Sequence, residues 1–251
     1  MIAFVTSRGD HAFVGVYDIE ADEVRYLDPG LDLDGSPVWS PDSRSVAFIR
    51  RPHVQDRLPF FPLRSGHPWS IRVADAETGH GREVWRADEG TGSVFREISA
   101  ENQLMWGAGD RLVFPWEKDG WTHLYSVAAR GGQAAFLTPG DFEVQFVSLS
   151  PDGSEVLFSS NQGDIDRQHI WRVPVGGGRP ESVTAGTGVE WSPVVTAESG
   201  TVAYLGSGPT EPAMTRVLGG GETPVVPGAS EMPGAYPSGR LVVPEQVTFS
   251  S

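Results

Sequence analysis

A repeat of about 44 residues is the feature that most constrains the fold of this chain. Five short apolar segments end in an aromatic residue, at Phe4, Phe48, Phe114, Phe158 and Tyr204. The intervals between these aromatics are 44, 66, 44 and 46 residues, and the longest is one repeat with an insertion of about twenty residues. Recurrence of one pattern at a fixed interval is the signature of a repeat architecture, so the sequence predicts stacked copies of a single unit.

Each repeat also carries a turn before the aromatic residue and further strands after it. The preceding turns have related sequences and occupy residues 39–43, 106–110, 150–153 and 191–193. Their Pro-Asp-Gly type suits a tight turn, because Pro presets φ, Asp caps the backbone and Gly accepts positive φ. Second strands are predicted at residues 16–18, 71–73, 124–127, 170–173 and 215–217, and two short strands end at Thr138 and Thr184. A unit therefore holds about four short strands with hairpin signals between them.

A four-stranded unit that recurs every 40 to 50 residues is typical of a β-propeller blade. The composition agrees, because 31 Gly and 20 Pro among 251 residues leave few windows for long helices. A two-sheet sandwich would explain the turns but not the recurrence of sequence. We therefore predict an all-β propeller of four-stranded antiparallel blades, with about five blades present in an incomplete ring.

The predicted propeller covers residues 1–227 and has two insertions, at residues 51–69 and 85–103. The first insertion contains Arg57, Phe60, Phe61, Arg64 and His67, and it either packs on the blade rim or forms a lip that faces peptides. A short helical turn is a further possibility at residues 99–103. Residues 228–251 are predicted to be a Gly/Pro-rich linker followed by an exit strand toward the rest of a longer polypeptide.

Composition excludes several classes of function. The chain has 33 acidic and 19 basic residues, and phosphate binding needs concentrated positive charge, so a nucleic-acid partner is not expected. No run of about 18 apolar residues occurs, so no membrane span is predicted. The absence of cysteine excludes disulfides and thiol catalysis but leaves the compartment open between cytoplasm, periplasm and secretion.

No catalytic, metal or cofactor motif is present in the sequence. A hydrolase nucleophile elbow needs Gly-x-Ser-x-Gly, and no serine satisfies both glycine positions. The six histidines share no metal-ligand spacing, and His123 and His169 hold equivalent places in their repeats, which indicates blade packing. Asn161, Asp164 and Asp166 are candidates for a calcium loop, although turn capping with a salt bridge to Arg167 is favoured.

The acidic segment at residues 28–34 is a second candidate for a calcium loop. Asp28, Asp32 and Asp34 precede Gly35, but Gly30 and Pro41 stand where the EF-hand pattern requires an oxygen ligand. That mismatch excludes an EF-hand, and a phosphate-binding loop is absent as well because no suitable glycine spacing precedes Lys118. We therefore expect no cofactor.

Residues 112–125, Leu-Val-Phe-Pro-Trp-Glu-Lys-Asp-Gly-Trp-Thr-His-Leu-Tyr, resemble the propeller of prolyl oligopeptidase family serine peptidases, in the dipeptidyl peptidase IV branch. The resemblance continues through residues 137–144, 149–153, 161–173 and 190–194, and residues 244–249 resemble the strand that leads into the hydrolase domain. It implies a non-catalytic cap over an α/β-hydrolase domain of the same polypeptide. The cap would admit and orient short peptides, and the Ser-Asp-His triad should lie beyond Ser251.

The resemblance also suggests candidate substrate-binding residues. Relatives in this branch hold the substrate's amino terminus with adjacent glutamates on a propeller insertion, since a carboxylate pair can fix an ammonium group. This chain has no Glu-Glu pair, which puts strict dipeptide release in doubt. Two pairs of acids in the second insertion are candidates to replace it: Asp88 with Glu89, and Glu97 with Glu101. Arg96 of the same insertion is a further candidate substrate-binding residue. A solvated acidic loop is the alternative interpretation.

Two other functions compete with the peptidase cap. A Tol-type propeller that serves as a protein-interaction platform would share the turns but would need neither the Asp-Gly-Trp run nor the exit strand. A self-sufficient propeller enzyme would need acidic or His residues at matching positions of several blades, which the sequence lacks. A homo-oligomer stays open, because an incomplete ring would expose unpaired edges.

Overall fold

The computed structural model describes residues 1–53, 65–100, 102–219, 224–228, 230 and 232–249. The described chain is all-β, as predicted, and its helical residues are confined to 3₁₀ conformation near the C-terminus, at Ser230 and in the turn Ser238–Arg240. Positions 54–64 of the first predicted insertion lie outside the described residues, and they include Arg57, Phe60, Phe61 and Arg64. Among the described residues, no helix is long and apolar enough to cross a bilayer.

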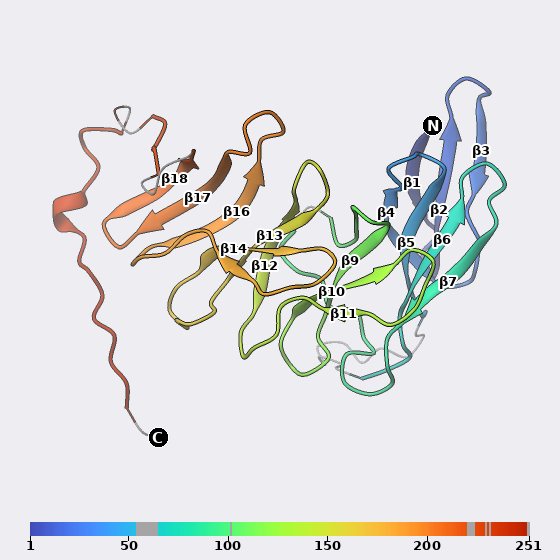
Figure 1. Cartoon of the computed structure of the whole chain (residues 1–251), viewed down its shortest axis with the longest axis horizontal. Helices are drawn as coiled ribbons and strands as arrows, with labels where there is room; N and C mark the ends of the chain where they lie inside the picture. The colour runs from blue at the N-terminus through green and yellow to red at the C-terminus, as the bar shows by residue number, and fades with distance from the viewer. Residues whose placement is uncertain (54–64, 101, 220–223, 229, 231, 250–251) are drawn as a thin grey trace.

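Five groups of consecutive strands follow one another along the chain, and we call them units 1 to 5 (Figure 1). Unit 1 has strands β1 (Ile2–Ser7), β2 (Ala12–Asp18) and β3 (Glu23–Tyr26); unit 2 has β4 (Leu33–Trp39), β5 (Ser45–Arg51), β6 (Ser70–Asp75) and β7 (Gly81–Arg86). Unit 3 has β8 (Met105–Gly107), β9 (Arg111–Trp116), β10 (His123–Ala128) and β11 (Ala135–Phe136). Unit 4 has β12 (Val144–Leu149), β13 (Glu155–Ser160), β14 (His169–Pro174) and β15 (Glu181–Ser182); unit 5 has β16 (Val189–Val195), β17 (Val202–Gly208) and β18 (Glu211–Leu218).

Units 2, 3 and 4 are four-stranded antiparallel meanders, in agreement with the sequence pattern. Units 1 and 5 each have three antiparallel strands among the described residues. Units 1 and 2 belong to one seven-stranded sheet, but the link between them is a parallel pairing at Ala12 and Leu33. No other strand pairing joins unit 1 to unit 2 among the described residues.

The repeated aromatic residue packs each unit against the one before it. Phe48, Phe114 and Phe158 are fully buried, and Tyr204 is 5% exposed. Each belongs to a separate apolar cluster that joins its own unit to the preceding one; Phe48, for example, packs with Val14 of unit 1. Because successive strand residues point to opposite faces, the neighbours of each aromatic face the following unit. The 44-residue repeat is thus the spacing of successive inter-unit contacts.

Antiparallel pairing divides the connections between two ends of the molecule. Within a meander, the turn from the first to the second strand and the turn from the third to the fourth lie at one end, which we call the hairpin end. The second-to-third connection and the link to the next unit lie at the opposite end, which we call the insertion end. The described residues of both insertions, 52–53, 65–69, 87–100 and 102–104, are therefore at the insertion end. In Figure 1 the hairpins β12–β13 and β16–β17 point to the upper side, and the C-terminus lies on the lower side.

Two local expectations differ from the structure. Residues 241–249, which include the predicted exit strand, form no strand. Residues 99–100 and 102–103 form bends and coil instead of the suggested helical turn, because the Gln103 side chain bonds both the N–H and the carbonyl of Ile98. Those bonds close the loop through a side chain, where a helix would use its own backbone.

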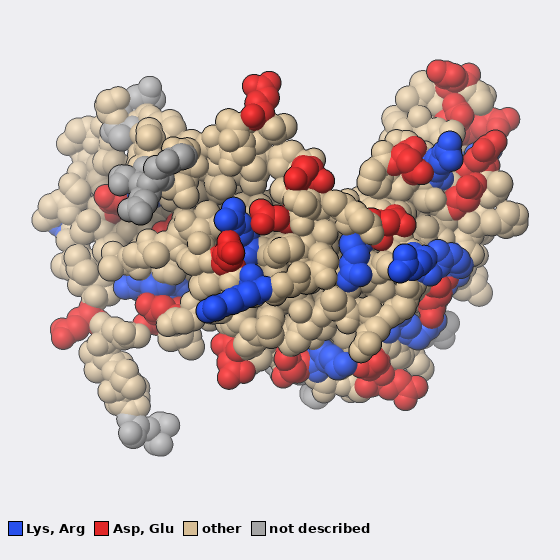
Figure 2. Space-filling view, viewed as in Figure 1, with Lys and Arg blue, Asp and Glu red and all other residues tan. Residues whose placement is uncertain are grey.

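Charged side chains are mixed on the surface. Figure 2 shows short blue stretches bordered by red ones on the face drawn, with no continuous basic area over the described residues of that face.

Candidate functional site

The second insertion is fixed at Gly92 by two tryptophans. The indole N–H groups of Trp69 and Trp116 both donate to the Gly92 carbonyl oxygen, at 3.1 and 2.9 Å. Gly92 has φ of 83°, and a Cβ at this position would lie 2.6 Å from the carbonyl oxygen of Glu117. Only glycine accepts this conformation and this close approach without strain. The loop that carries the predicted substrate-binding residues is therefore held against the end of β9.

The adjacent Ser93 extends this anchor. Its side chain is fully buried, and its hydroxyl donates to the Gly90 carbonyl at 2.7 Å while accepting the Gly66 N–H at 2.7 Å. The Trp69 N–H also donates to the Ser93 carbonyl at 3.2 Å. These bonds join the described end of the first insertion to the second, so the two insertions form one structure at the insertion end.

Aromatic side chains form the floor beneath this anchor. Trp69 contacts Trp85, Phe95 and Phe114 with ring centroids 4.9, 4.7 and 5.7 Å apart, and Trp85 contacts Trp116 at 4.9 Å. Edge-to-face pairs of this kind contribute about 0.5–1.5 kcal/mol each beyond the buried area. The second insertion is thus supported by an aromatic cluster that lies between units 2 and 3.

Three of the five predicted substrate-binding residues form ion pairs with the body of the propeller. Asp88 contacts Lys118 at 2.8 Å, Arg96 contacts Glu117 at 3.3 Å, and Glu97 contacts Arg51 at 3.1 Å. Glu89 is exposed, and no ion pair is found for it in the described part of the chain. Glu101 lies outside the described residues.

The predicted acids do not converge on one partner. Asp88 is tied to the segment after β9, whereas Glu97 is tied to the end of β5. Both carboxylates are 62% exposed, so each pair contributes about 0–1 kcal/mol. The Lys118 ammonium also lies 4.8 Å from the centre of the Trp116 ring. The loop combines a rigid base at Gly92 with exposed charges that water or a ligand can reach.

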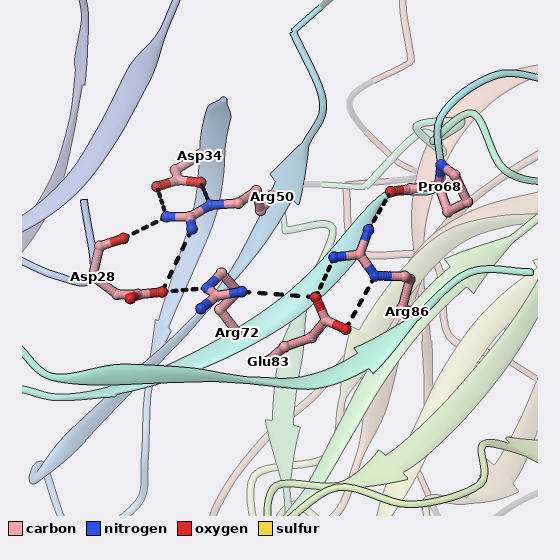
Figure 3. Close-up of polar contacts among 7 residues, drawn as sticks. All are labelled: Asp28, Asp34, Arg50, Pro68, Arg72, Glu83 and Arg86. Carbon is pink, nitrogen blue, oxygen red and sulfur yellow. Dashed lines mark hydrogen bonds and ion pairs between the residues drawn. The ribbon is translucent and has the colours of Figure 1, made fainter. Parts of the chain in front are cut away.

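An arginine and carboxylate network on unit 2 was missed by the sequence interpretation (Figure 3). Arg50 binds Asp34 through two bonds, from Nε to Oδ1 at 2.6 Å and from Nη2 to Oδ2 at 2.8 Å. Its Nη2 also donates to the Asp28 carbonyl at 2.5 Å. Arg72 links the Asp28 carboxylate to Glu83, and Glu83 in turn pairs with Arg86.

This network explains the acidic residues that precede Gly35. Asp28 and Asp34 are neutralised by arginines from β5 and β6, and Asp34 is only 2% exposed. Burial raises the pKa of Asp34, while the hydrogen bonds and charge of Arg50 oppose that rise. The signal available in the sequence was that Arg50 is two residues from Phe48, which places both on the same face of β5. The network holds the strand end from which Arg51 contacts Glu97.

The two histidines in equivalent places lie inside their units. His123 is fully buried between Phe136 and Phe142, with ring centroids at 5.0 and 5.3 Å, and burial lowers its pKa. His169 Nδ1 lies 2.5 Å from Oε2 of Glu190. Both arrangements agree with the predicted packing role.

The candidate calcium loop is organised by turn capping. Asn161 Oδ1 accepts the Glu143 N–H at 2.9 Å, and Asp164 Oδ1 accepts the Asp166 N–H at 2.9 Å. In the described chain, no group of three or more His, Cys, Asp or Glu side chains is placed to hold a metal ion. Asp166 instead accepts a hydrogen bond from the Gln246 side chain at 2.6 Å. Because Asp166 lies between β13 and β14, this bond brings residues 241–249 to the insertion end.

A cavity of about 1350 Å³ lies between units 4 and 5, away from the predicted residues. Its apolar walls include Leu157 and Tyr204. Several of its charged groups already form ion pairs: Arg216 contacts Glu211 at 2.7 Å, and Glu190 binds His169. The cavity marks a thinner contact between these two units, and the insertion end is the better candidate for a functional site.

The meanders stacked through a repeated aromatic define the class of this protein as a β-propeller. The sequence profile of the dipeptidyl peptidase IV (DPP IV) N-terminal region matches residues 63–213, more than half of the 251-residue chain. The chain therefore belongs to this family, the N-terminal region of dipeptidyl peptidase IV, as the resemblance of residues 112–125 predicted.

Solved structures support the fold. A puromycin-hydrolyzing peptidase from Mycobacterium tuberculosis matches with a TM-score of 0.57 and 20% identity over 86% of this chain and 32% of the other. TolB from Acinetobacter baumannii matches with a TM-score of 0.53 and 17% identity over 89% of this chain and 51% of the other. An oligogalacturonate lyase from Vibrio parahaemolyticus matches with a TM-score of 0.62 and 13% identity over 89% and 61%. The chain spans from a third to three fifths of these proteins.

Proposed function

We propose that this chain is the non-catalytic propeller part of a serine peptidase, and that its insertion end gates and orients short peptides for an α/β-hydrolase domain of the same polypeptide. The observation that carries the proposal is the placement of three segments at one end. Residues 65–69, residues 87–100 and residues 241–249 all lie at the insertion end. A domain that follows residue 251 would begin at the same end of the propeller as residues 87–100, which carry Asp88, Arg96 and Glu97.

The chemistry of the loop suits recognition of a peptide amino terminus. Glu89 is exposed and free of ion pairs in the described chain, and its neighbour Asp88 already holds an ammonium group, that of Lys118. A substrate ammonium could replace Lys118 at the same carboxylate, since the pair is half exposed and weak. The rigid base at Gly92 would fix where the bound terminus lies, which sets the position of the scissile bond.

A Tol-type interaction platform is the second candidate, because the likeness to TolB covers 89% of this chain. It predicts recognition of a folded protein surface and requires neither an ammonium site nor a hydrolase. Reading the frame beyond Ser251 in the parent gene separates the two functions. A nucleophile elbow Gly-x-Ser-x-Gly within a few hundred residues supports the peptidase, and a stop codon supports the platform.

Calorimetric titration of the chain with tripeptides tests the site itself. We expect a peptide with a free amino terminus to bind about 2- to 5-fold more tightly than its N-acetylated form, the size of a solvent-exposed ion pair. Asp88→Asn with Glu89→Gln should abolish that difference, and Glu77→Gln, an exposed acid at the hairpin end, should preserve it. The isolated chain should not hydrolyse a dipeptidyl chromogenic substrate. Equal affinity for free and acetylated peptides would overturn the ammonium site.

A further inference from the structure

Unit 5 carries a hydroxyl group at the position of the repeated aromatic residue. Phe48, Phe114 and Phe158 fill this position in units 2, 3 and 4, whereas unit 5 has Tyr204, which is 5% exposed and lines the cavity between units 4 and 5. Burial raises the pKa of Tyr204, so the hydroxyl keeps its proton. A buried tyrosine hydroxyl usually has a hydrogen-bond partner, but that of Tyr204 has none among the residues that the structure describes. An unsatisfied donor therefore borders a space large enough for a ligand.

Arg216 places a cation beside this hydroxyl. Arg216 pairs with Tyr204 across β17 and β18, so both side chains lie on one face of unit 5. The Arg216 side chain is 19% exposed and lies over Gly206, where a Cβ would be 2.6 Å from Arg216 Nε. The partner found for it in the described chain is Glu211, at 2.7 Å, and the Glu211 side chain is 60% exposed. A guanidinium group has five N–H donors, so donors remain for an acceptor in the cavity.

The arginine at the same register position of unit 2 has two acidic partners. Arg72 pairs with Phe48 across β5 and β6, as Arg216 pairs with the aromatic residue of unit 5. Arg72 binds Glu83 of its own unit and also the carboxylate of Asp28, which follows the last strand of unit 1. The cation of unit 2 is thus neutralised from both units, whereas the acid paired with Arg216 in the described chain belongs to unit 5 itself.

Unit 4 has a hydroxyl group where unit 1 supplies that carboxylate. Leu27 donates its N–H to β2 and is followed by Asp28. Val183 makes the same bond to β14, the equivalent strand of unit 4, and it is followed by Thr184. The Thr184 hydroxyl donates to Glu190 at 3.2 Å, so this acid on the cavity wall already has a partner. The place that an acid occupies beside Arg72 is therefore open to a ligand beside Arg216.

We propose that the cavity between units 4 and 5 binds a small carboxylic acid with an apolar body, whose carboxylate accepts hydrogen bonds from Arg216 and Tyr204. The planar fork of an arginine suits a carboxylate, and the exposed Glu211 is a weak competitor for it. The apolar body lies against Leu157 and Val202 on the two walls. Both walls consist of described strands of the chain, and this site is independent of the peptidase function.

Calorimetric titration of the whole chain with phenylacetate and with phenylacetamide tests the proposal. The acid should bind about 10-fold more tightly than the amide, because hydrogen bonds between charged groups are the stronger ones. Arg216→Met should abolish this difference. Tyr204→Phe restores the side chain of the other units and should weaken binding of the acid by about 2- to 10-fold. Glu211→Gln removes the competing carboxylate and should tighten it by about 2- to 5-fold.

Arg172→Met is the matched control for charge. Arg172 also lines the cavity, but Glu155 and Glu181 hold it at 3.9 and 3.1 Å, so its removal should change the affinity for phenylacetate by less than about twofold. Titration with N-acetyl-Gly-Gly-Phe shows whether a peptide carboxyl terminus is accepted as well as a free acid. Both answers agree with the proposal if phenylacetate binding depends on Arg216.

Three results would overturn the proposal. Phenylacetate that does not bind, or that binds no more tightly than phenylacetamide, contradicts a carboxylate site. An equal loss of affinity in Arg172→Met and Arg216→Met assigns the effect to general charge. If Tyr204→Phe and Glu211→Gln both bind the acid like wild type while circular dichroism shows them folded, the ligand lies elsewhere.

Discussion

Arg50→Met removes the cation that is bonded to the buried carboxylate of Asp34. In the wild type, Arg50 makes two bonds to Asp34, at 2.6 and 2.8 Å, and one to the Asp28 carbonyl at 2.5 Å. The Asp34 side chain is 1% exposed and that of Arg50 is 11% exposed. Methionine fills much of the same volume without charge, so the change tests electrostatics more than packing.

Breaking a buried ion pair from one side costs about 3–5 kcal/mol, because the remaining charge keeps its desolvation penalty without its partner. For a domain of this size, 1 kcal/mol corresponds to about 2–4 °C in Tm, so we expect Arg50→Met to lower Tm by about 6–20 °C. Arg86→Met is the matched control, because Arg86 and Glu83 are 52% and 33% exposed. That pair should contribute no more than about 1 kcal/mol.

The loss of stability should depend on pH. Burial raises the pKa of Asp34 in the fold, and removing Arg50 deletes the hydrogen bonds and the charge that oppose this rise most, leaving only the weaker effect of Arg72. The folded state of Arg50→Met therefore takes up a proton at a higher pH than the unfolded chain, for which the carboxyl pKa is about 3.9. The penalty is full above the folded pKa and shrinks as the pH falls through it, so the stability gap between Arg50→Met and wild type should narrow as the pH is lowered from neutral toward the ordinary carboxyl pKa.

Urea unfolding followed by tryptophan fluorescence, at several pH values, measures these differences. The double variant Arg50→Met with Asp34→Leu should recover much of the stability, because it removes the isolated charge as well as its partner. The reasoning fails if Arg50→Met costs no more than Arg86→Met at neutral pH, or if its penalty is the same at both ends of the pH range.

Two further predictions concern single positions. Gly92→Ala should destabilise the chain by about 2 kcal/mol or more, because positive φ and a steric clash combine at this position. It should also speed hydrogen exchange at the two indole N–H groups that bond to Gly92. Gly90→Ala, which has a similar φ but open space around it, should cost only about 1 kcal/mol. Burial lowers the pKa of His123 below its ordinary value of 6.5, so the unfolded chain takes up this proton at a higher pH than the folded chain. Wild-type stability relative to His123→Phe should therefore be full above about pH 6.5 and fall as the pH drops below it. Equal slopes for the two proteins, or an effect of the same size in exposed His80→Asn, would contradict the assignment.

The sequence predicted which loop carries the candidate site but not the residues that the loop contacts. Asp88, Arg96 and Glu97 lie in the connection between β7 and β8, and their role in substrate binding stays a prediction. Their partners were not predicted, because Lys118 and Arg51 are distant in sequence and meet the loop only when units 2 and 3 stack. The bonds from Trp69 and Trp116 to Gly92 could not be predicted either, because no local sequence pattern marks a carbonyl that accepts two indole N–H groups.

The sequence by itself determined the all-β class and the placement of the aromatic contacts, because both depend on local periodicity. Alternation along a strand and turn residues at fixed spacing act over a few residues, and the 44-residue interval repeats them. Only the tertiary structure decided that Asp28 and Asp34 bind arginines and that the Gly92 carbonyl accepts two indole N–H groups. Charge pairs and buried faces form between segments tens of residues apart, and their free energy depends on distance and burial, which the order of residues does not contain.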